Sequence, residues 1–287
     1  MKKQVAGFVN RCLARWGLVL SRKSTNASVM KRSIGSLLRA ADAEAWFDIA
    51  INGVDVFLPR DTLRTMVHCF HFSEGQKPAL WVETEHLKWM IAAISQGGTF
   101  LDVGASTGAI TIPIALAYGP RVAIHAYEPA TPARTLLERT LARNAISSVE
   151  VHGAAVADAI GTAEFIEWGY DDTDQTPFLP EGSALSVPQQ AVTQGTRCMV
   201  PVVTLDHEMS RVSPGPVVVK IDVEGFEGRV IDGGPEFLQR CRPHLSIDIH
   251  ADPFQTQTTT EAEVRAKLSR LGYTFEKVNH VLFCTPP

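Results

Sequence analysis

FLDVGASTG, from Phe100 to Gly108, is the stretch that decides the fold. A short apolar run ends in an acid and a glycine. The apolar residues from Thr107 to Tyr118 then predict a helix that closes at Gly119-Pro120. The pattern therefore predicts a strand, a tight turn and a helix. Glycines in such a turn let backbone N–H groups approach a ligand, and the start of the helix favours negative or electron-rich groups.

The spacing within this turn separates two classes of nucleotide ligand. A dinucleotide-binding turn has the order G-x-G-x-x-G, whereas this chain has D-x-G-A-x-x-G, with Asp102 two residues before the first glycine. A carboxylate there suits the positively charged amino-acid head of S-adenosylmethionine (SAM). Glu128 follows a second apolar strand, Arg121 to Tyr127, where an acid commonly binds ribose hydroxyls, and it fits SAM and NAD equally. The plain structural alternative is a glycine turn in another α/β protein.

Composition and charge narrow the function classes. The chain has 287 residues, of which 45% are hydrophobic and 20% charged, and its five scattered cysteines form no CxxC pair. This predicts a globular protein of a reducing compartment, the cytoplasm, without a disulfide framework or a zinc site. Nine of the 27 Lys and Arg residues precede the first acid, Asp42, so 18 bases stand against 31 acids in the rest of the chain. That acidic body argues against a nucleic-acid substrate.

Three regions are predicted along the chain. Residues 1–45 place Phe8, Leu13 and Trp16 at helical spacing between bases, which fits either a helix on an anionic membrane surface, at the inner face of the membrane, or a helix packed on protein. Residues 46–98 form an N-terminal cap with a hairpin at Asn52-Gly53. Residues 99–287 form the main domain.

The main domain alternates strands with helices, which predicts a mostly parallel sheet with ligands at the carboxyl ends of its strands. A long polar loop between strands 162–168 and 197–205 is typical of a lid. The other expected elements are a helix from Glu83 to Ser95, a helix with Thr131 as N-cap and its end at Asn144, strands at Val149–Val156, Val217–Ile221 and His244–Ile249, a helix from Thr260 to Leu271, and a closing hairpin from Tyr273 to Cys284.

Five motifs together resemble the FkbM-type SAM-dependent O-methyltransferases. They are FLDVGASTG at 100–108, Tyr127-Glu128-Pro129, Asn144, Thr204-Leu205-Asp206 and KIDVEGFE at 220–227. The resemblance covers about residues 80–250, and KIDVEGFE is its most specific part. It implies a class I methyltransferase (Rossmann-like) fold: a mostly parallel seven-stranded sheet with an antiparallel edge hairpin and a small N-terminal cap. It also implies O-methylation of a hydroxyl on a glycan, glycolipid or related secondary metabolite. The residues that it assigns to SAM are Asp102, Gly104, Ala105, Ser106, Gly108, Glu128 and Asn144.

Methyl transfer to an aliphatic hydroxyl needs more than positioning, because the protonated hydroxyl is a poor nucleophile. Asp222 is the first candidate for contacting that hydroxyl, with Lys220 and Glu224 beside it and His250 as the alternative base. A divalent ion held by Asp222, Asp248 and His250 is the other way to activate the hydroxyl. Simpler roles compete: Glu224 and Glu227 suit a helix N-terminus, and Lys220 suits a buried ion pair.

Two other functions remain open at this point. A nicotinamide-dependent oxidoreductase uses a similar sheet but needs the closer glycine spacing. A non-catalytic interaction module would keep the fold but not the acids, whereas Asp102, Glu128, Asp222 and Glu224 are all present.

Overall fold

The computed structural model describes residues 38, 40–66, 69–71, 78–167, 184–185, 196–249 and 260–287. The predicted basic helix at the N-terminus, most of the predicted lid and His250 lie outside these residues. The chain divides at Thr84 into two compact units, which are described separately here. The domain limits expected at residues 45 and 98 stay predictions.

The first unit contains a small four-stranded sheet with the order β2-β1-β4-β3. The predicted hairpin is present, and Asn52 and Gly53 form its turn with φ of 47° and 83°, which short polar residues and glycine tolerate best. Ile49 and Leu58 are fully buried between the strands and the following helix. The elements of this unit are β1 (Trp46–Ile51), β2 (Val54–Pro59), α3 (Arg60–Thr65), β3 (Phe70–His71) and β4 (Ala79–Leu80).

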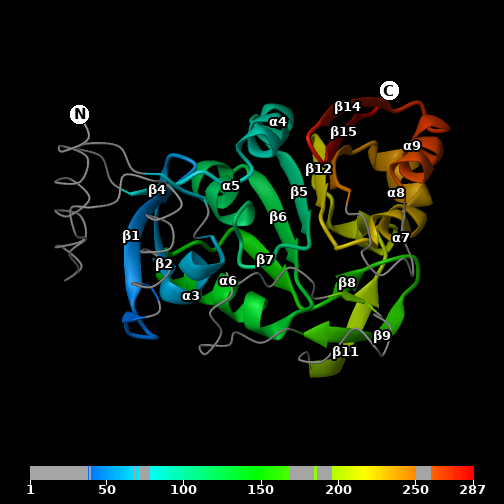
Figure 1. The fold of residues 1–287 in the computed structure, drawn as a ribbon. Helices are drawn as coiled ribbons and strands as arrows, with labels where there is room; N and C mark the ends of the chain where they lie inside the picture. Colours follow the sequence, from blue (N-terminus) through cyan, green and yellow to red (C-terminus); the bar gives the residue numbers. More distant parts are fainter. Residues whose placement is uncertain are drawn as a thin grey trace. The chain divides into compact units, whose positions relative to one another are not determined.

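The second unit is built on a seven-stranded sheet with the order β14-β15-β13-β12-β5-β6-β7 (Figure 1). The strands from β13 to β7 are parallel to their neighbours, and β15 pairs antiparallel with both β13 and β14. This is the predicted class I fold with its antiparallel edge hairpin. The strands are β5 (Gly98–Val103), β6 (Val122–Tyr127), β7 (Val149–His152), β12 (Val217–Ile221), β13 (His244–Asp248), β14 (Thr274–Val278) and β15 (Val281–Thr285).

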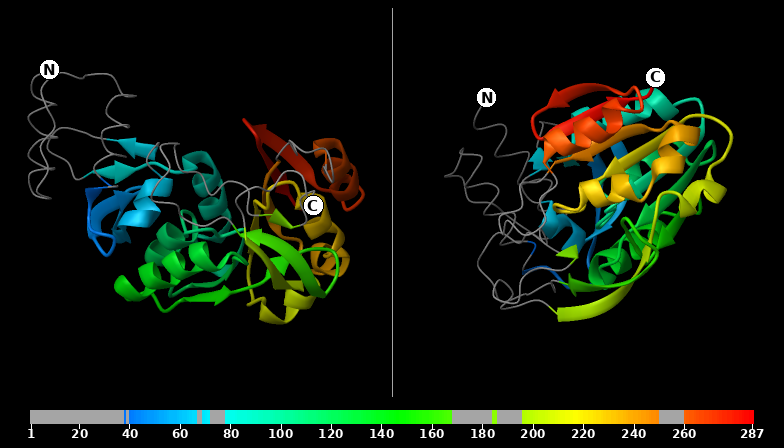
Figure 2. Two further views of the ribbon diagram at one scale, coloured as in Figure 1. Left: turned by 60° about the horizontal axis from the view of Figure 1, so that its bottom comes forward. Right: turned by 90° about the vertical axis from the view of Figure 1, so that its right-hand side faces the viewer.

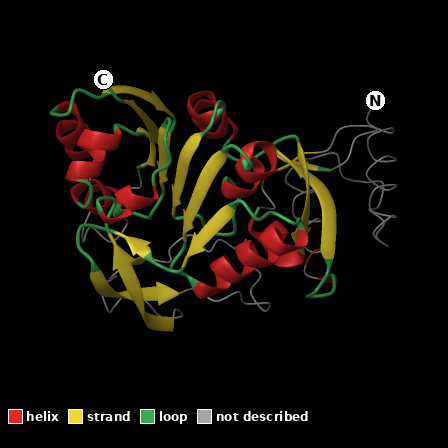
Figure 3. Ribbon diagram, turned by 180° about the vertical axis from the view of Figure 1, so that it is seen from behind, coloured by secondary structure: helices red, strands yellow, loops and turns green. Residues whose placement is uncertain are grey.

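Helices cover both faces of this sheet (Figure 3). Alternate residues of a strand point to opposite faces, so Phe100 packs with α4 and α5 while its neighbour Leu101 packs with α7, α8 and α9. In Figure 2 the red C-terminal hairpin lies beside the orange helix α9. None of the helices in the described residues combines the length and apolar character needed to cross a membrane. The helices are α4 (Thr84–Ile94), α5 (Thr111–Tyr118), α6 (Thr131–Arg143), η2 (His207–Arg211), α7 (Glu227–Asp232), α8 (Pro235–Cys241) and α9 (Glu261–Ser269).

The predicted third strand, Val149 to Val156, is wrong as a single element. Its first half is β7 of the large sheet, and Gly153 and Ala154 then interrupt the strand. Its second half is β8, which joins another sheet with the order β10-β9-β11-β8. The strands predicted at 162–168 and 197–205 are β9 and β11, which pair antiparallel. The strands added here are β8 (Ala155–Val156), β9 (Gly161–Glu167), β10 (Ala184–Leu185) and β11 (Thr196–Val203).

Two predicted helix starts differ from the structure. Helix α5 begins at Thr111 rather than Thr107, because Gly108 has φ of +90°, which no right-handed helix contains. Helix α6 has Ala130 as its N-cap, and Thr131 is already its first residue. Helix α9 begins where the sequence predicted, and the Thr260 side chain and Glu263 form a reciprocal capping box at its start.

Candidate active site

The loops that follow β5 and β12 meet at the carboxyl edge of the large sheet. The two strands are parallel neighbours in which Lys220 pairs with Asp102 and Ile221 with Val103. The loop after β12 therefore starts beside the glycine turn, and the backbone N–H of Asp222 donates to the Val103 carbonyl at 3.0 Å. The pairing brings the two most distinctive motifs of the sequence together.

Gly104 shows how closely these loops approach each other. Its φ is +82°, and a Cβ at this position would lie 1.9 Å from the backbone oxygen of Asp222. A side chain is therefore excluded on both conformational and steric grounds. The glycine is required by contact between two backbones, and this contact leaves the N–H groups of the turn in a fixed arrangement.

Lys220 joins the two loops through its ammonium group. The side chain is buried, and Nζ donates to the Gly104 carbonyl at 3.0 Å. Nζ also lies 3.1 Å from Asp222 Oδ2 and 3.5 Å from Asp102 Oδ1. Both carboxylates offset the cost of burying the ammonium. The buried ion pair considered for Lys220 is thus present, with one acid on each motif.

Asp102 is the most deeply placed member of the site, with no exposed surface. Besides Lys220, its partner is Thr111, whose hydroxyl donates to Oδ2 at 2.6 Å. Thr111 is the first residue of α5, so the carboxylate lies at a helix N-terminus, where negative charge is favoured. Asp102 therefore fixes the entry to α5 as well as the turn before it. The role of Thr111 was missed from the sequence, where it reads as an ordinary helical residue.

Glu128 lies at the tip of β6 and faces the glycine turn. Its Oε2 accepts from the Ser106 N–H and its Oε1 from the Ala130 N–H, both at 2.8 Å. Burial raises the pKa of this carboxyl to about 7, against the opposing effect of the two N–H donors. An acid at this place can bind paired hydroxyls when it is ionised. Residues Ser106 and Glu128, both predicted to bind the cofactor, are in direct contact.

The remaining predicted cofactor residues divide into two sets. Ala105 is buried in the turn and its N–H donates to the Tyr127 carbonyl at 3.0 Å, and Gly108 closes the turn. Asn144, in contrast, is the C-cap of α6, where its side chain donates to the Thr140 carbonyl. The 13 residues of α6 separate it from Glu128 by about 20 Å at 1.5 Å per residue. The structure does not bring Asn144 to the other residues.

The predicted catalytic acids lie along the same edge. Asp222 is partly exposed, and Glu224 follows it in a turn with φ of +55°. Asp248 ends β13, next to β12, and its carboxylate lies 3.4 Å from His280 Nε2. Glu227 is fully buried and accepts from the Gly225 N–H at 3.0 Å. This contact at the start of α7 fits the structural role at a helix N-terminus considered for Glu227.

The predicted metal ligands are not assembled in the described residues. Asp222 and Asp248 belong to no group of three His, Cys, Asp or Glu side chains with closely spaced ligand atoms in the part of the chain that the structure describes. The third predicted ligand, His250, lies outside that part. The metal hypothesis for this edge therefore has no support from the described geometry.

Comparison with protein families now adds to this geometry. The family model described as the methyltransferase FkbM domain matches residues 102–275, which include both loops of the site. The chain belongs to the FkbM methyltransferase family. The resemblance inferred from the five motifs is thereby confirmed. No curated protein matches the chain in sequence.

Several solved methyltransferase structures are similar to this chain at low sequence identity. The FkbM methyltransferase of Methylobacillus flagellatus is 16% identical, with a TM-score of 0.43, over 70% of this chain and 51% of that one. This FkbM family member thus spans about half the length of that relative. Precorrin-6y C5,15-methyltransferase of Geobacter metallireducens is 12% identical, with a TM-score of 0.39, over 75% of this chain and 91% of that one. An rRNA methylase of Streptococcus thermophilus is 9% identical, with a TM-score of 0.37, over 71% and 95%.

Proposed function

We propose that this FkbM family member transfers a methyl group from SAM to a hydroxyl of a glycan, glycolipid or related secondary metabolite. The observation that carries the proposal is the contact between the Ser106 N–H and the buried Glu128 carboxylate, beside a glycine turn that no side chain could enter. This arrangement fits the binding of a nucleoside whose ribose hydroxyls donate to the Glu128 carboxylate. SAM supplies an electrophilic methyl group on a sulfonium.

The acceptor hydroxyl belongs, in this proposal, beside Asp222. Lys220 holds Asp222 Oδ2 at 3.1 Å and so fixes the direction of the carboxylate. A carboxylate in this place would accept the hydroxyl proton, while bound SAM would supply the methyl group by breaking its S–CH₃ bond and leave as S-adenosylhomocysteine. Lys220 acts through Asp222 and is a positioning residue. Glu224 and His250 are the other candidates near the acceptor.

Calorimetry with separate ligands tests the cofactor. We expect the protein to bind SAM and S-adenosylhomocysteine, and to bind NAD weakly, because the glycine spacing at 104–108 differs from the dinucleotide pattern. Tight binding of NAD without binding of SAM would replace the proposal with the oxidoreductase alternative. Failure to bind either ligand would favour the interaction module.

The affinity for SAM is expected to depend on pH through Glu128. Ribose hydroxyls donate to an ionised carboxylate, and the pKa of Glu128 is raised to about 7. Below that pH the proton must leave before SAM binds, so affinity should fall by about tenfold from pH 8 to pH 6. Without SAM, the Glu128 carboxyl has a higher pKa in the folded protein than in the unfolded chain. The protonated carboxyl therefore contributes to stability at low pH, and this contribution is lost as the pH rises from 4.5 through 7.

Glu128→Gln isolates this effect. The variant should bind SAM more weakly by about 1–3 kcal/mol at pH 8, because a charged hydrogen bond is lost, and its affinity should vary less with pH. Titration of SAM itself affects both proteins equally and cancels in the comparison. Glu138→Gln, at an exposed site on α6, is the matched control and should behave as wild type. A wild-type affinity profile in Glu128→Gln would remove Glu128 from the cofactor site.

The basic N-terminal segment supports a further proposal about location. With nine bases before the first acid, it would hold an otherwise acidic enzyme at an anionic membrane surface, where a glycolipid acceptor is available. Anionic vesicles should co-sediment the full chain but not a chain that starts near Ala45. Equal binding of both would refute membrane contact and favour a helix packed on protein.

A further inference from the structure

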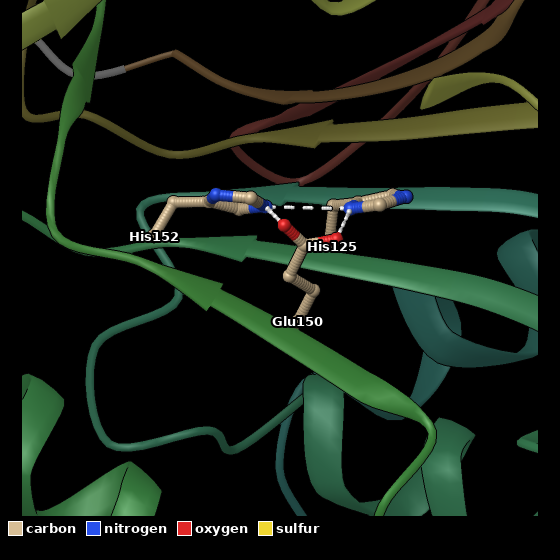
Figure 4. Close-up of side chains that lie close together, drawn as sticks. All are labelled: His125, Glu150 and His152. Carbon is tan, nitrogen blue, oxygen red and sulfur yellow. Dashed lines mark hydrogen bonds and ion pairs between the residues drawn. The ribbon is translucent and has the colours of Figure 1, made fainter. Parts of the chain in front are cut away.

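Two histidines and a glutamate gather on β6 and β7 (Figure 4). The strands are parallel, and their register sets His125 opposite Glu150 and Tyr127 opposite His152. Residues at intervals of two share a face, so all four side chains project from the same side of the sheet. The proposed methyl transfer makes no use of this group.

The three polar side chains point their ligand atoms at one another. His125 Nδ1 lies 3.3 Å from His152 Nε2 and 3.4 Å from Glu150 Oε2, and His152 Nε2 lies 3.8 Å from Glu150 Oε1. These atoms all fall within 4.8 Å of one another. In tetrahedral zinc sites with metal–ligand distances of 2.0–2.1 Å, neighbouring ligand atoms are about 3.3 Å apart. The spacing in this group is therefore close to that of ligands sharing one ion.

The chemical state of the ligands also suits an ion. Burial lowers the pKa of both His125 and His152, so both rings are neutral at neutral pH. Their rings lie nearly parallel, with centroids 5.5 Å apart and an interplanar angle of 28°, and His152 also stacks on Tyr127. This stacking limits ring rotation. The two imidazoles are thus held in place before any ligand binds, which reduces the entropic cost of binding.

Arg211 is the one cation near the group that the described contacts show, and it is already paired. Its Nη1 donates to Glu150 Oε1 at 2.7 Å, and its Nε lies 2.8 Å from Glu208 Oε2. Glu208 is buried and also accepts from the Tyr127 hydroxyl. The Arg211 charge is therefore offset by Glu208, and Arg211 orients Glu150 from the side of Oε1. Oxygen Oε2 is the one nearer His125.

A contact outside the three ligands resembles the surroundings of known metal sites. The His125 ring donates to the backbone carbonyl of Arg211. Histidines that bind metals usually make such a second contact, which fixes the ring orientation and the tautomer. Both the carboxylate and one imidazole of the group are thus held from outside by a single residue of η2.

We propose that His125, Glu150 and His152 form a binding site for Zn²⁺ or a similar late first-row divalent ion, with water completing the coordination. Two imidazole nitrogens and one carboxylate oxygen are a donor set that such ions prefer over Mg²⁺ or Ca²⁺. The carboxylate is about half exposed, so an ion reaches the group from solvent. The bound ion would link the short edge strand β7, through Glu150 and His152, to β6, through His125.

This site would act on the cofactor site only through the backbone. The His152 carbonyl accepts from the Glu128 N–H at 3.0 Å, so β7 supports the tip of β6, where Glu128 lies. The ion would therefore stabilise the fold at the base of the ribose receptor. It would not contact the reacting groups, and the proposal stands whether or not the chain binds SAM.

Titration of the full-length protein with Co²⁺ and Zn²⁺, after removal of metal with EDTA, tests the site. We expect one equivalent of Co²⁺ to bind with a visible absorption spectrum typical of nitrogen and oxygen ligands, Zn²⁺ to displace it, and Zn²⁺ to raise the Tm. His152→Gln should weaken binding by at least about 100-fold, since even losing an outer partner of a metal ligand costs roughly 10–100-fold. Glu150→Gln, at an exposed position, should show the same loss without a risk to folding.

His244→Gln is the matched control. His244 is a half-buried histidine on β13 of the same sheet, outside the group, and its substitution should leave Co²⁺ binding unchanged. The chain has nine histidines and five cysteines, so the position-specific loss decides the question. The proposal is overturned if the wild type binds no stoichiometric ion, or if Glu150→Gln and His152→Gln bind as the wild type does. The three residues would then form only a hydrogen-bonded cluster.

Discussion

Replacing Asp222 with Asn is expected to lower turnover by about 10²–10⁴-fold, the range that general acid–base catalysis supplies. Asn keeps the size and the oxygen that faces Lys220, but it cannot accept the hydroxyl proton. The carboxylate follows β12 beside Gly104, whereas the proposed ribose receptor, Glu128, lies at the end of β6. SAM affinity should therefore change little. The measurement is methyl transfer from labelled SAM to a glycolipid and polysaccharide extract, with SAM binding followed separately by calorimetry.

Asp232→Asn provides the matched control for this variant. Asp232 also pairs with a lysine, Lys267, at 2.8 Å, but at the exposed end of α7, and its loss should leave turnover unchanged. Adding EDTA to the Glu150→Gln variant, which lacks a ligand of the ion site proposed on β6 and β7, separates a carboxylate base from a metal-activated hydroxyl, since a base needs no ion. Normal turnover by Asp222→Asn would show that another group takes the proton, and His250 would be the next residue to replace.

The second large effect is expected from Asp102→Ala, which should lower the free energy of unfolding by about 3–5 kcal/mol. The substitution removes the Asp102 carboxylate that lies 3.5 Å from the buried Lys220 ammonium, and it removes the acceptor of the Thr111 hydroxyl. Denaturant unfolding of the protein without ligand measures this loss apart from any effect on SAM. Turnover and SAM binding should also fall, because the glycine turn follows Asp102 directly.

Comparison with an exposed ion pair makes this prediction specific. Lys88 and Glu85 lie 2.8 Å apart on α4 with most of each side chain exposed, and Glu85→Ala should cost no more than about 1 kcal/mol. The double variant Asp102→Ala/Lys220→Met removes both buried charges and should recover part of the lost stability. If Asp102→Ala is no less stable than Glu85→Ala, the buried pair does not hold the two motifs together.

The sequence predicted the strands of the large sheet well because most of them are apolar on both faces. Lys220 and Asp102 stood out as charged residues within such runs, and parallel neighbours bring them into contact. Residue patterns along the sequence mispredicted the ends of elements where the chain changes direction at a glycine. Gly108 turns the chain with a positive φ before α5 can begin, and Gly153 ends β7 so that β8 joins a different sheet.

Contacts across strands were the least predictable part of the site. His125 and His152 are 27 positions apart, and only the register of β6 and β7 shows that their rings meet. The alternation of Glu150 and His152 was the single local hint. Asn144 shows that a motif match gives no distance: the residue caps the end of α6 that lies far from the glycine turn.

The contact between Gly104 and the Asp222 carbonyl has a consequence for redesigning acceptor specificity. The turn that would receive the cofactor rests on the loop that carries the proposed base, with no side chain between them to absorb a shift. Exchanging residues 222–226 for those of a relative would shift the Asp222 carbonyl and, with it, the glycine turn proposed to bind SAM. A new acceptor preference would therefore come with altered SAM affinity. Directed evolution toward a new acceptor is therefore expected to recover paired substitutions, one in each loop.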